Sequence, residues 1–216
     1  MKVRIICDNR AMEGYQADWG FACLVEAEEN VLFDTGAKPS VLQHNMAASN
    51  VDPGTVDYIV LSHDHEDHTG GLPYMSSSNT KAEVIVLPSF GRLVRQQAAP
   101  LAVREITAAG EISPGIHSTG PVQGPMPEQA IALNTDQGVV IITGCAHPGV
   151  DVLMEAVSDL GAVHAVLGGF HGFSNFSALE GIPFLAPCHC TQHTQEIADR
   201  FPESYVEIMA GTELEF

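Results

Sequence analysis

The chain has few positive charges for its length. Of its 216 residues only 9 are Lys or Arg, against 27 Asp and Glu, so the formal net charge at pH 7 is −18. Such an imbalance repels a phosphate backbone, which argues against nucleic acid as a partner. A substrate that carries an anionic group therefore needs a local source of positive charge, such as a bound divalent ion.

A paired cysteine pattern and a long apolar run are also missing. The five cysteines are an odd set without the spacing of a disulfide framework: Cys7, Cys23, Cys145, Cys188 and Cys190. No run approaches the length that spans a bilayer, so we expect a cytoplasmic protein with no membrane partner. The length and the 45% hydrophobic content suit one sizeable core, which predicts a single domain over residues 1–216.

Short apolar strands, separated by turns and a few helices, dominate the pattern. The predicted strands are residues 2–7, 20–27, 30–34, 57–62, 83–87, 129–134, 138–143, 162–167, 182–186 and 205–209. The predicted helices are residues 39–48, 150–160 and 191–201. Residues 89–129 contain several Pro and Gly residues, and we expect them to form a wall or lid rather than a second core. This succession indicates an α/β fold.

Potential metal ligands crowd the end of one predicted strand. Residues 63–68 read His-Asp-His-Glu-Asp-His and follow the apolar run 58–61 after a single serine, so His63, His65, Asp67 and His68 lie within six residues. Three imidazoles and a carboxylate suit zinc, with iron or manganese as alternatives. A structural zinc site usually includes thiolates, and this run has none. The run therefore predicts a centre of one or two divalent ions with room for water.

Histidines also follow three later predicted strands. His147 lies in the loop Gly-Cys-Ala-His-Pro-Gly, and His171 and His189 come after the next two strands. Because α/β folds gather their chemistry at one edge of a sheet, we expect these side chains to share the site. Cys188 and Cys190 flank His189 either as ligands or as small buried apolar side chains. We expect surface or packing roles for the other histidines, His44, His117, His164 and His193. Among these, His193 is the best candidate for a role in the site, because it lies one helical turn after His189.

Taken together, these features resemble the metallo-β-lactamase-fold hydrolases. The resemblance rests on the His-x-His-x-Asp-His run, on Leu32–Gly36 before it, on Thr69–Leu72 after it, and on His147 and His189 in chain order. The dihydropterin-methyl-ribofuranosylaminobenzene-phosphate synthase branch of that family is similar in residues 118–121, 128–130, 144–149, 168–171 and 189–191. The resemblance implies a four-layer αββα sandwich with its metals at one edge.

A set of ligands for two ions is also implied by the resemblance. One ion is held by His63, His65 and His147, and the second by Asp67, His68 and His189. Asp34 is either a carboxylate that orients a ligand imidazole or a turn residue before Gly36. Many dinuclear members carry a bridging Asp where this chain has His171. His171 is therefore expected to bind one metal, to contact substrate or to donate a proton. Gln192 replaces a Gly that is usual in the branch.

Metallohydrolase activity is the function that the resemblance implies. Water on a divalent ion loses its proton near neutral pH and can attack an electrophilic carbon or phosphorus. Asp67 would orient that nucleophile, and His171 would protonate the leaving group. We expect a small ester, lactone or phosphate-bearing substrate. The alternatives are a pterin-type synthase and a metal-dependent binding or sensor protein without turnover. Three arginines either hold an anionic group or aid solubility: Arg92, Arg95 and Arg104.

Overall fold

The computed structural model describes residues 1–216, which divide into two compact units, each with its own sheet. The first unit comprises residues 1–107 and 209–215, and the second comprises residues 108–208 and 216. The expectation of one domain over residues 1–216 stays a prediction. No helix combines the length and the apolar character that crossing a membrane requires.

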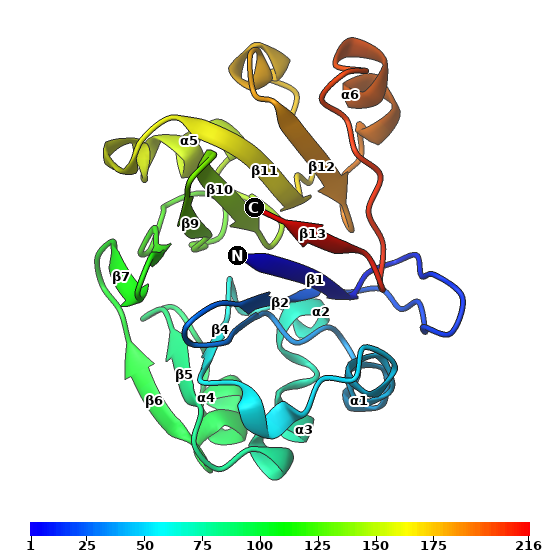
Figure 1. Ribbon diagram of the computed structural model, residues 1–216. Helices are drawn as coiled ribbons and strands as arrows, with labels where there is room; N and C mark the ends of the chain where they lie inside the picture. The colour runs from blue at the N-terminus through cyan, green and yellow to red at the C-terminus, as the bar shows by residue number, and fades with distance from the viewer. The chain divides into compact units, whose positions relative to one another are not determined.

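The first unit contains a seven-stranded sheet in the order β13-β1-β2-β3-β4-β5-β6. Its strands are β1 (Lys2–Cys7), β2 (Ala22–Glu26), β3 (Val31–Phe33), β4 (Tyr58–Val60), β5 (Glu83–Val86), β6 (Ala102–Glu105) and β13 (Glu213–Glu215). Pairing is antiparallel from β13 to β3 and parallel from β3 to β6. The last strand thus lies beside the first, as the red and blue arrows in Figure 1 show.

Short helices cover a core built on this sheet. They are α1 (Pro39–Ala48), α2 (Glu66–Thr69), α3 (Leu72–Ser78), α4 (Arg92–Ala98) and the 3-10 turn η1 (Pro53–Thr55). Leu42 and Met46 of α1, with Met75 of α3, join the buried cluster that includes Leu32 and Ile59 of the sheet. Parallel strands need such crossover connections, which is why helices fall between β3 and β6.

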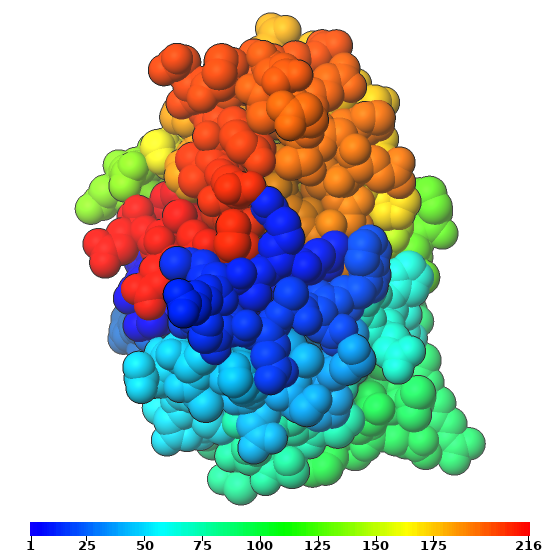
Figure 2. All heavy atoms as spheres, turned by 90° about the vertical axis from the view of Figure 1, so that its right-hand side faces the viewer, coloured from blue at the N-terminus to red at the C-terminus, as the bar shows by residue number.

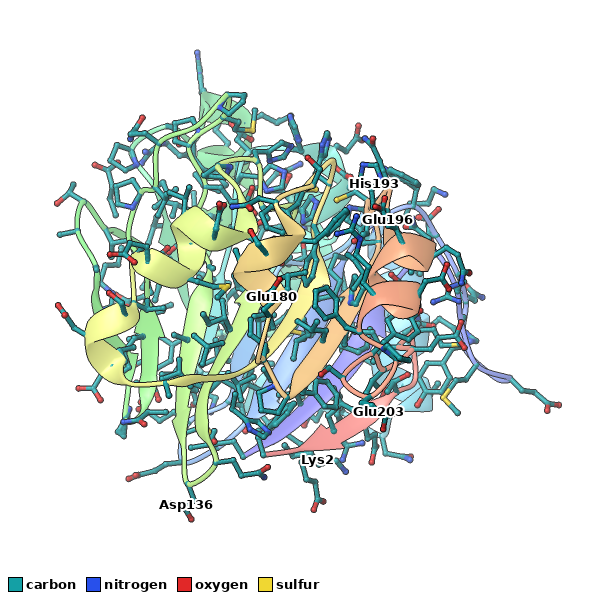
Figure 3. All side chains as sticks on the ribbon, turned by 90° about the horizontal axis from the view of Figure 1, so that it is seen from above. Lys2, Asp136, Glu180, His193, Glu196 and Glu203 are labelled. Atoms are coloured by element: carbon teal, nitrogen blue, oxygen red, sulfur yellow. The ribbon has the colours of Figure 1, made fainter.

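The second unit contains a six-stranded sheet in the order β12-β11-β10-β9-β8-β7. Its strands are β7 (Gly110–Ser113), β8 (Ile116–Ser118), β9 (Ile131–Thr135), β10 (Gly138–Thr143), β11 (Val163–Gly169) and β12 (Phe184–Cys188). The helices are α5 (Val150–Glu155), α6 (Thr194–Arg200), η2 (Ser158–Leu160) and η3 (Phe176–Leu179). The predicted hairpin of β9 and β10 is confirmed, with Asp136 at its tip (Figure 3). Because β10, β11 and β12 run parallel, the loops that follow them leave the same edge of the sheet.

Residues 89–129 are more regular than predicted. They contain α4, β6, β7 and β8, so they are not an irregular segment, whereas their role as a wall or lid stays a prediction. Val94 and Ala98 of α4 belong to the buried core of the first unit. Some of the Pro and Gly residues fall in the short connections between these elements, such as Pro100 and Pro114, and Gly110 begins β7. They therefore mark the ends of elements and do not prevent regular structure.

The predicted strand over residues 205–209 is also wrong. Only Tyr205 forms an isolated bridge, to Leu185, and Val206 donates one backbone hydrogen bond to Leu185. The alternating apolar residues that predicted a strand still bury Ile208, but the segment forms no strand ladder. Two predicted helices are shorter than expected, because α5 ends at Glu155 and α6 begins at Thr194. The sequence pattern missed α2, α3 and β13, which are too short to show a clear period.

Candidate metal centre

The loop after β4 brings the first donors together. His63 Nε2 lies 3.0 Å from His65 Nδ1, and the ring centroids of His63 and His68 are 4.2 Å apart. Two nitrogens bound to one tetrahedral ion at about 2.0–2.1 Å are roughly 3.4 Å apart, so the His63 and His65 nitrogens already have nearly that spacing. His63 is fully buried and His65 is half-buried.

The single turn of α2 supplies a second pair. His65 is the N-cap of α2, and the helix then carries Asp67 and His68. Asp67 Oδ2 lies 3.7 Å from His68 Nε2. Trp19, whose exposed fraction is 59%, donates from its indole Nε1 to Asp67 Oδ2 over 3.0 Å. The N-terminal part of the chain, which carries Trp19 (blue in Figure 2), lies on the surface beside light-blue residues of the same unit.

Asp34 orients two of these histidines, as predicted for a carboxylate behind the ligands. Its Oδ2 lies 2.7 Å from His68 Nδ1 and also accepts from Ser62 Oγ over 2.7 Å. Ser62 Oγ in turn lies 2.9 Å from His63 Nδ1. A carboxylate acceptor holds the proton on Nδ1, which leaves the lone pair of Nε2 for a metal. Asp34 therefore fixes His68 directly and His63 through Ser62.

Glu128 plays the same part in the second unit, and sequence reasoning missed its role. Its buried carboxylate accepts from the backbone N–H groups of Cys145, Ala146 and His147 at 2.8–2.9 Å. Its Oε2 also lies 2.8 Å from His147 Nδ1. Glu128 appeared in the sequence only as part of a shared segment, residues 128–130. Because it lies 19 residues from His147 in the chain, no local spacing could reveal the contact.

His171 and His189 follow β11 and β12. The His171 ring is exposed and its centroid lies 5.1 Å from that of His147. Both rings line a cavity of about 420 Å³ with Asp151, Phe173 and Asn175 among its walls. His189 is 9% exposed, and one of its ring nitrogens lies within 4.8 Å of the Sγ atoms of Cys145 and Cys190.

Backbone strain marks the same loops. Asp34, Ala146, His171 and His189 have positive φ angles of 58°, 57°, 42° and 50°. Apart from Asn50, they are the only residues other than glycine with this conformation. Left-handed backbone is unfavourable for residues with a Cβ and clusters at functional sites, so the loops that carry these four positions are candidates for a functional role in each unit.

The other candidate residues have structural contacts. His193 is the N-cap of α6, with its Nδ1 3.6 Å from Glu196, and Figure 3 labels both residues. Arg95 donates to backbone carbonyls and to Glu105, and Arg104 lies 3.0 Å from Glu83. Arg95 and Arg104 are thus paired with carboxylates of the chain, and a role in holding an anionic group stays a prediction. Arg92 is exposed at the start of α4.

The chemistry of the donors fits divalent metal ions. Within the first unit the structure brings His63, His65, Asp67 and His68 together. The second unit presents His147 after β10 and His189 after β12, at the same edge of the sheet and with β11 between the two strands. Metal-ligating histidines usually donate their other ring N–H to a carboxylate or backbone acceptor, which is the arrangement of His68 and His147.

Comparison with known proteins agrees with this fold and donor set. A model of the metallo-β-lactamase superfamily matches residues 19–168, which is more than half of the chain. The chain therefore belongs to the metallo-β-lactamase superfamily. The predicted family and fold class are thus confirmed.

The relatives include a synthase and several metal-dependent proteins. The chain is 26% identical to the 7,8-dihydropterin-6-methyl-4-(β-D-ribofuranosyl)-aminobenzene-5'-phosphate synthase of Methanocaldococcus jannaschii over 263 aligned positions, which cover 91% of this chain and 90% of that protein. The predicted resemblance to this branch is confirmed. A structure described as a metal-dependent hydrolase of the β-lactamase superfamily has a TM-score of 0.84 at 24% identity and covers 100% of this chain and 99% of its own. Zn²⁺-bound PqqB from Methylobacterium extorquens has a TM-score of 0.67 at 13% identity, with 100% of both chains covered.

Proposed function

We propose that the protein is a metal-dependent hydrolase of a small ester, lactone or phosphate-bearing substrate. The pairing of two buried carboxylates with two histidines, Asp34 with His68 and Glu128 with His147, carries this proposal. A buried carboxylate is costly unless it is fully hydrogen-bonded, and packing alone does not require one behind an imidazole. Metal-ligating histidines commonly have one as the acceptor of their other ring N–H, and such pairs occur here in both units.

The proposed centre has six ligands. We assign one ion to His63, His65 and His147, and a second ion to Asp67, His68 and His189. Membership of the superfamily supports this assignment, and the matched residues 19–168 include five of the six ligands. Zinc is the first choice for these nitrogen and oxygen donors, with iron or manganese as alternatives. When bound, such ions supply Lewis acidity and activate water at neutral pH.

Two residues of this chain take part in the proposed reaction, Asp67 at the attacking water and His171 at the leaving group. Asp67 orients the attacking water, and the indole of Trp19 holds that carboxylate in place through its 3.0 Å hydrogen bond. His171 protonates the leaving group, because its exposed imidazole stands in the wall of the cavity beside His147. The Asp151 carboxylate in the same wall disfavours an anionic substrate group there.

A pterin-type synthase is the second candidate function. It is favoured by the 26% identity to the Methanocaldococcus jannaschii synthase over most of both chains. A location in the cytoplasm, a small-molecule substrate and the lack of a nucleic-acid partner remain part of the proposal. The acidic composition, with a net charge of −18, supports the last of these.

Metal analysis combined with a substrate screen tests the proposal. Protein purified without added metal should contain one or two equivalents of a divalent ion and should hydrolyse a member of a panel of esters, lactones and phosphodiesters. The variant His63→Ala should lose metal and activity, whereas His44→Ala, an exposed histidine of the same unit, should keep both. Less than about one equivalent after reconstitution would contradict the metal centre. Metal without hydrolysis, together with turnover of a dihydropterin substrate, would favour the synthase.

A further inference from the structure

Two cysteine thiols lie beside His189 in the second unit. The Sγ atoms of Cys145 and Cys190 and a ring nitrogen of His189 all lie within 4.8 Å of one another. Cys145 and His189 are buried, Cys190 is half-buried, and neither cysteine is in a disulfide. Two thiolates bound to one zinc ion at about 2.3 Å are roughly 3.8 Å apart, so small side-chain movements would bring the three atoms to a common ion.

Three parallel strand ends build this cluster. Cys145 follows β10, and His189 and Cys190 follow β12. Gly169, the last residue of β11, lies between them in the sheet and pairs with Cys188. A Cβ at position 169 would lie 2.3 Å from the backbone oxygen of Gly144, 2.7 Å from Cys190 Sγ and 3.2 Å from Cys145 Cα. The backbone after β10 therefore requires glycine here, and the same glycine leaves the space into which the Cys190 thiol reaches.

The backbone on both sides of the cluster is held in place. The N–H groups of Cys145 and Ala146 donate to Glu128 Oε1 over 2.8 Å, which fixes the loop after β10. On the other side, His189 adopts a left-handed conformation with φ of 50°. Packing of small apolar side chains requires neither a strained backbone nor a buried carboxylate. Donor atoms that must converge benefit from both, because such support preorganises a site.

We propose that Cys145, Cys190 and His189 form a thiolate–imidazole site for a soft or borderline divalent cation such as zinc or cadmium. Thiolate ligands select these ions over magnesium or manganese. On binding, each thiol releases its proton to solvent and each sulfur donates an electron pair, so no oxidant is needed. The proposal rests on the proposed function in one respect, because His189 is also assigned to the second ion above. Cys145 and Cys190 would add thiolates to the ligands of that ion and so make its ligand set softer.

Cobalt spectroscopy tests the proposal without an activity assay. Metal-free protein, kept reduced with a phosphine under anaerobic conditions, is titrated with Co²⁺ alone. We expect an intense thiolate-to-cobalt charge-transfer band in the near ultraviolet. The band should be lost in the double variant Cys145→Ser/Cys190→Ser and kept in Cys188→Ser, a matched control from the end of β12 that is not part of the cluster.

Each outcome separates this site from the rest of the metal centre. A band that persists in the double variant His63→Ala/Asp67→Ala supports a site that the thiols hold without those ligands. Bound cobalt that shows only weak visible bands in the unsubstituted protein overturns the thiolate site and leaves the proposed hydrolase centre standing. Cobalt that fails to bind at all overturns both. If circular dichroism shows that the double cysteine variant does not fold, the single variant Cys190→Ser takes its place. Cys190 is only half-buried, so this variant should fold, and the loss of one thiolate should weaken the band.

Discussion

At the scale of single residues, the buried carboxylates behind the histidines are the most sensitive positions. Glu128 accepts three backbone N–H groups and contacts His147 Nδ1, so every lone pair of its carboxylate faces a donor. Glu128→Gln would place an amide N–H against one of these donors. We expect zinc affinity to fall about 10–100-fold, the usual effect of losing such a partner, and stability to fall by about 1–3 kcal/mol.

Competition with a zinc chelator and denaturant unfolding measure these two effects. Exposed Glu203 offers a matched control, and Glu203→Gln should change neither quantity. Unchanged zinc affinity in Glu128→Gln would show that the carboxylate only supports the loop after β10.

Substitution of His171 distinguishes a proton donor from a metal ligand. If it protonates the leaving group, His171→Ala should keep the metal content and lower kcat by about 10²–10⁴-fold for substrates with poor leaving groups. Activated esters need little protonation, so their rates should fall less. Rates for both substrate types, together with metal analysis, are the measurement. Loss of metal with an equal fall on both substrates would instead identify His171 as a ligand.

At the scale of elements, the junction of α2 and α3 positions the donors of the first unit. A Cβ on Gly70 would lie 2.0 Å from the backbone oxygen of Ala37. Gly70→Ala therefore forces α2 away from the loop after β3, and overpacking of this kind costs about 1–3 kcal/mol or more. We expect a lower thermal midpoint and weaker metal binding, since α2 carries Asp67 and His68.

Thermal unfolding and metal titration of Gly70→Ala provide the check. Gly110→Ala is the control, because a Cβ there meets nothing within 4 Å. Equal behaviour of the two variants would contradict a positioning role for this junction.

The edge strand β13 is held to β1 by charge. The hydrogen bond from Lys2 lowers the pKa of Glu213, and the charge of Arg4 lowers it further. A lowered pKa in the folded state means that the stabilisation is present above the unfolded pKa of about 4.3 and is lost as pH falls through the folded value. Glu213 is exposed, so we expect Glu213→Gln to cost at most about 1 kcal/mol at neutral pH and nothing at strongly acidic pH. Unfolding measured over this pH range tests the sign, and a difference that grows on acidification would refute it.

At the scale of the whole molecule, bound metal should stabilise the native state. Free zinc at 100 times its Kd adds about 2.7 kcal/mol, which for a chain of this size raises the thermal midpoint by roughly 5–10 °C. Chelation should reverse the rise. Zinc should restore it and magnesium should not, because nitrogen donors bind magnesium poorly. Differential scanning calorimetry measures the shift, and equal midpoints with and without zinc would contradict metal binding by the folded protein.

The sequence by itself determined the chemistry of the donors and most of the strands. Four ligands within six residues after an apolar run are visible without any fold, and the Val- and Ile-rich runs predicted strands such as β10 and β11. These features are local, since strand propensity and ligand type depend on the residues themselves.

Only the tertiary structure decided which carboxylate holds which histidine. Asp34 reaches His68 across 34 positions and Glu128 reaches His147 across 19. It also placed β13 beside β1 and left residues 206–209 without a strand ladder. The physical reason is that these contacts depend on strand order, register and loop conformation, including left-handed residues such as Asp34 and Ala146. Periodicity along the chain reports only the local backbone and the side that is buried, so it carries no record of which distant groups meet.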